Sequence, residues 1–131
     1  AWRGVHLRAL AARAELDDVQ ALNGALGLAG AASVGETLEG YYVELGYDVL
    51  AVMRPNAAQS LMPFVRYETY DTQAEVPGGF SSNPASDVEI ATYGVAWKPH
   101  HQIVIKLYFL SIGNEAGSGQ DQLNIAVGYV F

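Results

Sequence analysis

The 131-residue sequence contains no cysteine and no long apolar run, and each absence excludes a class of fold. Without cysteine the fold is not held by disulfides, which fits a reducing compartment or an outer-membrane protein that needs no such bond. No segment approaches the roughly 18 consecutive apolar residues of a transmembrane helix. The segment 25–34, ALGLAGAASV, is the most helix-like apolar stretch, and we predict that it is a loop.

Basic residues are scarce as well, and this bears on partners and chemistry. The chain has 7 Lys and Arg against 14 Asp and Glu, a net charge of -7, which argues against a nucleic-acid partner because phosphate binding needs a basic face. No nucleophile elbow, phosphate-binding glycine loop or HExxH pattern is present. His100 and His101 are adjacent, so their side chains point apart on a strand edge and make a poor metal pair. We therefore predict no enzyme, no cofactor and no metal site.

What the sequence does contain is alternation, most clearly in its last stretch, 121–131 (DQLNIAVGYVF). Every second residue there is large and apolar: Leu123, Ile125, Val127, Tyr129 and Phe131. A period of two places these side chains on one face of an extended strand. A soluble protein rarely ends on an exposed apolar face, whereas a transmembrane β-barrel does, because lipid is the solvent of its outer surface.

Five further segments show strand patterns, and they give an expected order of elements. We predict strands over 2–15, 37–52, 61–71, 88–97 and 102–112, in addition to 121–131. The connection 16–35 has room for a short helix. In the second strand the outward face is Tyr41, Val43, Leu45, Tyr47 and Val49.

The connections between these strands alternate in length and in charge. The turns at 53–60 and 98–101 are short, and the loops at 16–36, 72–87 and 113–120 are longer, as periplasmic turns and extracellular loops are in outer-membrane barrels. The short turns carry Arg54, Lys98, His100 and His101. The longer loops and adjoining strand ends carry most of the carboxylates: Glu15, Asp17, Asp18, Glu36, Glu39, Asp71, Glu75, Asp87, Glu89, Glu115 and Asp121. Hard divalent cations shared with lipopolysaccharide favour such groups, but a solvated loop surface is the preferred explanation.

Two sets of side chains are candidate functional residues, one for each face of the expected sheet. Amphipathic rings belong at a membrane–water boundary, and the predicted lipid-facing girdle is Tyr41, Tyr67, Tyr93, Trp97, Phe109 and Tyr129, with Trp2 near the turn end. Cross-strand aromatic pairing in a soluble sheet is the alternative. The predicted pore-lining residues are Arg8, Glu44, Asp48, Arg66, Glu68 and Lys106. They would tune ion selectivity or, alternatively, form salt bridges that only solvate the wall.

Four runs, YYVELGYDVL, PFVRYETYDTQ, TYGVAWKPHHQIVIK and NIAVGYVF, resemble the C-terminal part of Gram-negative outer-membrane porins, most closely the phosphate-selective O/P type. The resemblance covers residues 40–131. It implies a passive pore, usually a homotrimer, inserted by the barrel assembly machinery, which reads a C-terminal aromatic signal matched here by Val127, Tyr129 and Phe131. The anion-binding residues of the phosphate-specific members lie largely outside this segment, so phosphate specificity does not carry over.

The prediction is thus an all-β, antiparallel, up-and-down transmembrane β-barrel segment of about six strands, in one domain over 1–131. Six strands cannot close a barrel, whose usual minimum is about eight, so we expect further strands upstream. The expected function is passive diffusion of small hydrophilic solutes or ions across a Gram-negative outer membrane, with lipid and lipopolysaccharide as neighbours. The alternatives are a small closed barrel with a structural or adhesion role, and a soluble β-sandwich or lipocalin-like binder.

Overall fold

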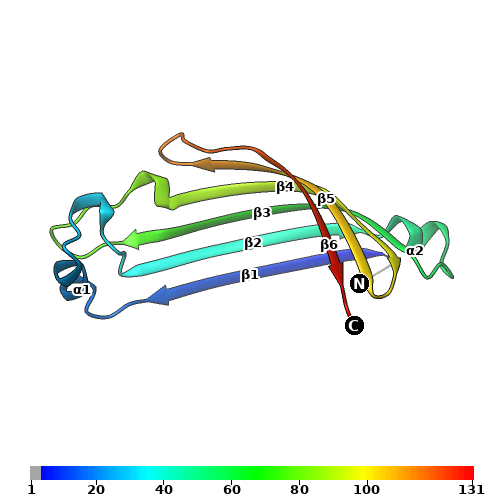
Figure 1. Ribbon diagram of the computed structural model, residues 1–131, viewed down its shortest axis with the longest axis horizontal. Coiled ribbons are helices and arrows are strands. Elements are labelled where there is room, and N and C mark those ends of the chain that lie inside the picture. The colour runs from blue at the N-terminus through cyan, green and yellow to red at the C-terminus, as the bar shows by residue number, and fades with distance from the viewer. Residues whose placement is uncertain (1–3) are drawn as a thin grey trace.

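A computed structural model describes residues 4–131 as one six-stranded antiparallel sheet in which each strand lies beside its neighbours in sequence (Figure 1). The strands are β1 (Val5–Glu15), β2 (Thr37–Tyr47), β3 (Ser60–Glu75), β4 (Asp87–His100), β5 (Ile103–Asn114) and β6 (Gln122–Tyr129). Two α-helices, α1 (Val19–Leu26) and α2 (Val49–Met53), and two 3₁₀ turns, Gly30–Ala32 and Pro84–Ser86, lie between strands. The all-β, up-and-down prediction is confirmed. The predicted start of the first strand and Trp2 fall outside the described residues.

The register of the sheet places the alternating residues on two distinct faces. Leu45, Val65, Tyr93, Phe109 and Leu123 lie directly opposite one another across β2 to β6. We call the face that carries this row the outer face. The opposite face, which carries Arg8, Glu44 and Arg66 in another such row, is the inner face.

The sheet has almost no hydrophobic core. Among residues 4–131, the buried hydrophobic side chains are Val19 and Ala96, neither of which is large. The large apolar residues of the outer face are exposed instead, and Ile125 on β6 keeps 74% of its surface open. A sheet normally buries one face against another layer, but nothing in the described chain covers this one.

The second strand ends earlier than predicted. β2 stops at Tyr47, because Asp48 caps α2: its Oδ1 accepts hydrogen bonds from the N–H groups of Leu50 at 3.1 Å and Ala51 at 3.2 Å. The prediction of a strand to residue 52, with Val49 on the outward face, was therefore wrong. The apolar segment 49–53 alternates weakly and reads equally as strand or helix; the cap decides for helix.

Three later strands run further than predicted, and the connections shrink accordingly. β3 continues to Glu75, β4 covers Asp87–His100 and β5 reaches Asn114. The polar residues at these strand ends predicted loop. Each end has partners on the neighbouring strand, as in the pairs Ser60–Lys98 and Val88–Asn114, so the backbone hydrogen bonding of the sheet continues there. The predicted turn at 98–101 is reduced to residues 101–102.

The connection between β2 and β3, 48–59, is longer than the loop 76–86, so the predicted difference in length between turns and loops was wrong there. The loops 16–36 and 76–86 are tied together at one end of the sheet. The buried Asn23 side chain donates to the carbonyl of Val34 at 3.1 Å and accepts from its N–H at 2.8 Å. The buried Gln73 amide donates to the carbonyl of Ser33 and accepts from the N–H of Asn83 at 2.6 Å. The predicted short helix in the first loop is present as α1. The segment 25–34, which was predicted as loop, contains the last two residues of α1 and a 3₁₀ turn.

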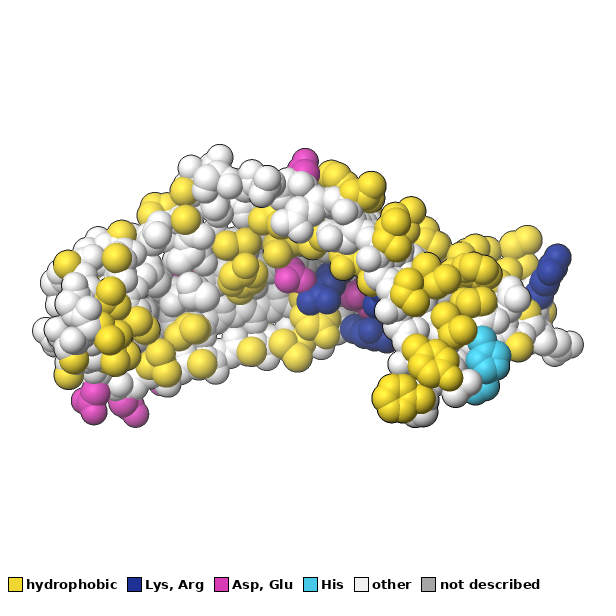
Figure 2. All heavy atoms as spheres, viewed as in Figure 1, with side chains coloured by type: hydrophobic (Ala, Val, Ile, Leu, Met, Phe, Trp, Pro, Cys, Tyr) yellow, Lys and Arg dark blue, Asp and Glu magenta, His cyan; other side chains and the backbone are white. Residues whose placement is uncertain are grey.

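The sheet is twisted and curved, so its two faces differ in shape as well as in chemistry. In Figure 1, β5 and β6 run at a steep angle to β1–β3, as the right-handed twist of strands requires. Figure 2 shows a hollow in the face towards the viewer, with Lys and Arg gathered beside Asp and Glu near its middle. Within residues 4–131, neither helix has the length and hydropathy needed to cross a membrane.

Candidate functional site

Four charged side chains on β1, β2 and β3 form a belt across the middle of the inner face. Arg8 lies opposite Glu44, and Glu44 lies opposite Arg66. Nη1 of Arg8 is 3.4 Å from Oε1 of Glu44, and Nε of Arg66 is 2.7 Å from Oε2 of Glu68. The second contact is an ion pair rather than a directed hydrogen bond, since Nε of Arg66 has no hydrogen-bond partner among the described residues. We call these four residues the charged belt.

The cations of the belt are more accessible than its carboxylates. The exposed fractions of the side chains are 62% for Arg8 and 34% for Arg66, against 15% for Glu44 and 24% for Glu68. The Arg66 guanidinium lies over the Tyr42 ring, with Cζ 4.1 Å from its centroid, and this cation–π contact holds it beside β2. Within the belt, Arg8 is therefore the group most open to a molecule in the hollow, while Glu68 is nearly as open as Arg66.

Lys106 lies on the same face, closer to the turn end. Its Nζ is 5.9 Å from the centroid of the Phe64 ring, and within the described chain it forms no ion pair. Arg8, Glu44, Arg66, Glu68 and Lys106 thus share the inner face, as the alternation predicted. Tyr42 and Phe64, which sequence reasoning missed, become visible only from the cross-strand register.

Asp48 is the exception among the predicted pore-lining residues. It follows β2 instead of belonging to it, and its carboxylate accepts from the N–H of Leu61 at 3.3 Å as well as capping α2. Burial acts to raise the pKa of Asp48, but hydrogen bonds from the Ser60 side chain and the N–H groups of Ala51, Leu61 and Leu50 outweigh it. The pKa of Asp48 is therefore lowered below 3.8. Its placement beside Glu44 on the strand was wrong.

Between the charged belt and the loops, the inner face carries an apolar groove that the sequence analysis did not identify. Its walls are Leu10, Ala12, Leu38, Tyr42 and Tyr70, with Arg66 and Glu68 at its lower end. Leu10 and Tyr70 are exposed, although both point to the side expected to be polar. Gly40 makes room for this arrangement, because a Cβ there would lie 2.8 Å from Cβ of Tyr70.

The predicted girdle residues all lie on the outer face with exposed side chains: Tyr41, Tyr67, Tyr93, Trp97, Phe109 and Tyr129. The Tyr41 and Tyr67 rings are 6.4 Å apart, and Tyr93 lies opposite Phe109. The residues predicted as an assembly signal, Val127, Tyr129 and Phe131, are exposed as well, and the last two rings stack at 6.3 Å. Their placement is as predicted, while their contact with lipid or the assembly machinery remains a prediction.

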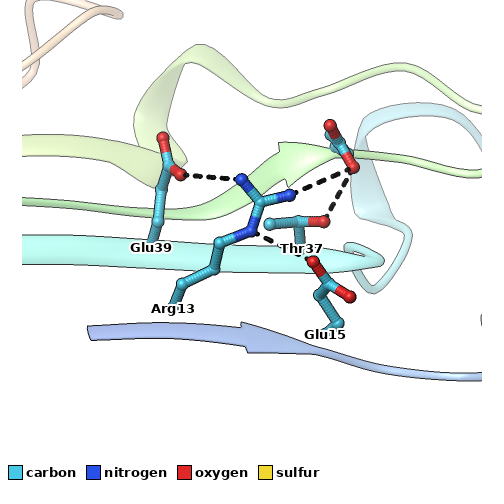
Figure 3. Close-up of polar contacts among 5 residues, drawn as sticks. Arg13, Glu15, Thr37 and Glu39 are labelled. Carbon is cyan, nitrogen blue, oxygen red and sulfur yellow. Dashed lines mark hydrogen bonds and ion pairs between the residues drawn. The ribbon is translucent and has the colours of Figure 1, made fainter.

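A polar cluster ends the apolar band of the outer face on the loop side (Figure 3). Arg13 contacts three carboxylates: Glu15 at 3.1 Å, Glu39 at 3.8 Å and Glu75 at 4.0 Å. Thr37 donates to Glu75 at 2.8 Å. These side chains are largely exposed, so the ion pairs contribute little stability. They mark the level at which the outer face changes from apolar to charged.

The two ends of the sheet differ in charge as the sequence predicted. In Figure 2, Asp and Glu lie at the end that carries α1, and His, Lys and Arg lie at the opposite end. The His100 and His101 rings are 4.0 Å apart at the turn between β4 and β5, so the prediction that their side chains point apart was wrong, because His101 lies in the turn and not on a strand. No group of three or more metal-ligating side chains occurs within residues 4–131.

Comparison with known proteins finds a relative but does not show a family. No family model and no solved structure matches the chain. An uncharacterized protein of Aquifex aeolicus (strain VF5) is 29% identical over 94 residues, which is 72% of this chain and 21% of the relative. The chain therefore spans about a fifth of the length of the curated relative it matches.

Proposed function

We propose that this sheet is part of the wall of an outer-membrane β-barrel pore, through which small hydrophilic solutes or ions diffuse passively. The observation that carries the proposal is the contrast between the two faces. The outer face is apolar and uncovered across β2–β6, while the inner face carries the charged belt and Lys106 in a hollow. Lipid as the solvent of one face and water as the solvent of the other accounts for both.

The outer face has the chemistry that a lipid boundary needs. Its apolar band ends on the loop side at the Arg13 cluster and carries aromatic side chains along its length. A soluble binder would normally cover such a face with a second layer, because exposed apolar patches this continuous favour aggregation. We place membrane lipid beside the band and lipopolysaccharide beside the acidic loop end.

The edges of the sheet support a larger barrel. Within the described residues, β1 pairs only with β2 and β6 only with β5, so each has one unpaired edge. Open edges are a liability in any sheet, and a barrel removes them by closure. We therefore propose that further strands complete the wall, and that Val127, Tyr129 and Phe131 on the outer face act as a signal for the assembly machinery.

The mechanism of such a pore is electrostatic filtering in water. Arg8 and Arg66 each have a carboxylate partner, so the belt is close to neutral and sets no strong preference between cations and anions by itself. The paired groups keep the lumen hydrated at its middle. The proposed homotrimer would place three such lumens side by side.

Single-channel recording of the full-length protein in a planar bilayer tests this function. We expect stepwise conductance, with ion selectivity read from the reversal potential in a salt gradient. The matched control is the same protein denatured by heat in detergent before addition, which should give no steps. Full-length protein that inserts into the bilayer and conducts nothing would overturn the proposal.

A further inference from the structure

An apolar groove is not expected in a lumen that passes only hydrophilic solutes. Leu10 and Tyr70 are exposed on the inner face, although the outer face is the one expected to carry uncovered apolar groups. An exposed apolar patch beside a charged cluster is a common form of ligand site, since it offers both burial and orientation. The inner face therefore carries apolar side chains that hydration of a lumen does not require.

The dimensions of the groove limit what it can hold. Its walls run from Leu38 to Tyr42 on β2, which is five residues, or four steps of extended strand, and thus roughly 13 Å. Tyr70, whose Cβ lies beside Gly40, forms one side, and Leu10 and Ala12 form the other. A single aromatic ring or a short aliphatic chain fits this length.

The lower end of the groove selects the charge of its occupant. Arg66 and Glu68 form this end, and Arg8 lies in the same row as Arg66, on the far side of Glu44. The Arg8 side chain is the most exposed of the belt at 62%, whereas Arg66 is 34% exposed and contacts Glu68, which is 24% exposed. Guanidinium binds carboxylate through two parallel hydrogen bonds, so the complementary head group is a carboxylate.

We infer that the apolar groove and the adjoining arginines bind a small monocarboxylate with an aromatic or aliphatic body. The body lies against Leu10, Tyr42 and Tyr70, and the carboxylate meets Arg66 or Arg8. This inference rests on the proposed pore in that it takes the inner face to be the lumen. It adds a preferred solute class to a pore otherwise described by size and charge.

Calorimetric titration of the full-length protein in detergent, with three probes, tests the inference separately from conduction. The probes are benzoate, which has ring and carboxylate, acetate, which has only the carboxylate, and benzamide, which has only the ring. We expect benzoate to bind at least about tenfold more tightly than either of the others, because only it uses both parts of the site. Equal affinities for benzoate and acetate would overturn the inference.

Variants locate the binding. Leu10→Ser and Arg66→Gln should each weaken benzoate binding by roughly tenfold, because one removes apolar contact and the other the ion pair. Leu110→Ser is the matched control: it lies on β5 in the same row as the belt and away from the groove, so benzoate binding should be unchanged. Equal weakening by Leu110→Ser would contradict a site in this groove.

The two proposals fail differently. Conductance with no preference for benzoate leaves the pore in place and removes the carboxylate site. Benzoate binding without conductance keeps the site and removes the pore. If a variant does not fold, the comparison of the three probes on the unaltered protein still decides the matter.

Discussion

One oxygen of the Asp48 carboxylate determines where β2 ends and α2 begins. Its Oδ1 accepts from Leu50 and Ala51 in α2 and from Leu61 at the start of β3, so it joins the helix to the next strand. These contacts stabilise the ionised form, which is why the pKa of Asp48 lies below its ordinary value. One side chain thus fixes the connection between β2 and β3.

Replacing Asp48 tests this role. Asp48→Ala removes the cap and should lower the free energy of unfolding by about 1 kcal/mol. Asp48→Asn keeps an accepting oxygen and should lose less, because Asn is also a good N-cap residue. The measurement is the urea midpoint of the full-length protein in detergent. A larger loss for Asp48→Asn than for Asp48→Ala would contradict the capping role.

The effect of Asp48 should depend on pH, with a definite sign. Because its pKa is lower in the folded state, its contribution is fully present above the unfolded-state pKa, which is near 3.8, and is lost as pH falls through the folded-state value. The difference in urea midpoint between the unaltered protein and Asp48→Ala should be the same at pH 7 and pH 5 and smaller at pH 3. A difference that grows on acidification would exclude this linkage.

At the scale of the element, β6 shows the two environments most clearly. Ile125 lies on the outer face with 74% of its surface exposed, and Asn124, its neighbour in sequence, points to the inner face. For a soluble sheet, a charge at an exposed position costs little. For a lipid-facing strand, the same charge is expensive, so adjacent substitutions distinguish the two cases.

We expect Ile125→Arg to cost about 2–4 kcal/mol of stability in lipid, and Asn124→Arg to cost far less, because the second charge faces water in the lumen. The measurement is denaturant unfolding in phospholipid vesicles, followed by heat-modifiable migration on a gel. Equal effects of the two variants would exclude lipid as the solvent of the outer face.

The sequence was sufficient for the strands and their faces but not for the details that depend on register. Alternation of large apolar with small or polar residues is a local property, and it placed Tyr41, Tyr93 and Ile125 on one face correctly. The end of β2 depends on hydrogen bonds that Asp48 accepts from three separate N–H groups, one of them beyond the turn. Local periodicity carries no information about such contacts.

The candidate site, too, could be predicted from the sequence only in part. Arg8, Glu44 and Arg66 could be assigned to the inner face from parity alone. That Arg66 lies over Tyr42 follows only from the pairing of β2 with β3. The apolar groove was missed because its walls come from three strands, and no single strand shows an apolar inner face.

At the scale of the whole molecule, the open edges of β1 and β6 allow a test of barrel closure. If β1 and β6 pair with further strands, their edge amide hydrogens, which point away from β2 and β5, gain partners. Those amides should exchange as slowly as amides inside β3 when the full-length protein is in lipid. Hydrogen-exchange mass spectrometry measures this, and fast exchange along both edges would argue for an open sheet.

The strand order has a consequence for how the sheet assembles in time. Every strand pairs with its neighbour in the chain, so no contact between strands has to wait for a distant segment. The connection between β4 and β5 is only residues 101–102, whereas β1 and β2 are separated by residues 16–36. Closing a short loop costs less entropy than closing a long one, so the β4–β5 hairpin is the natural nucleus, and the sheet grows outward from it to both edges.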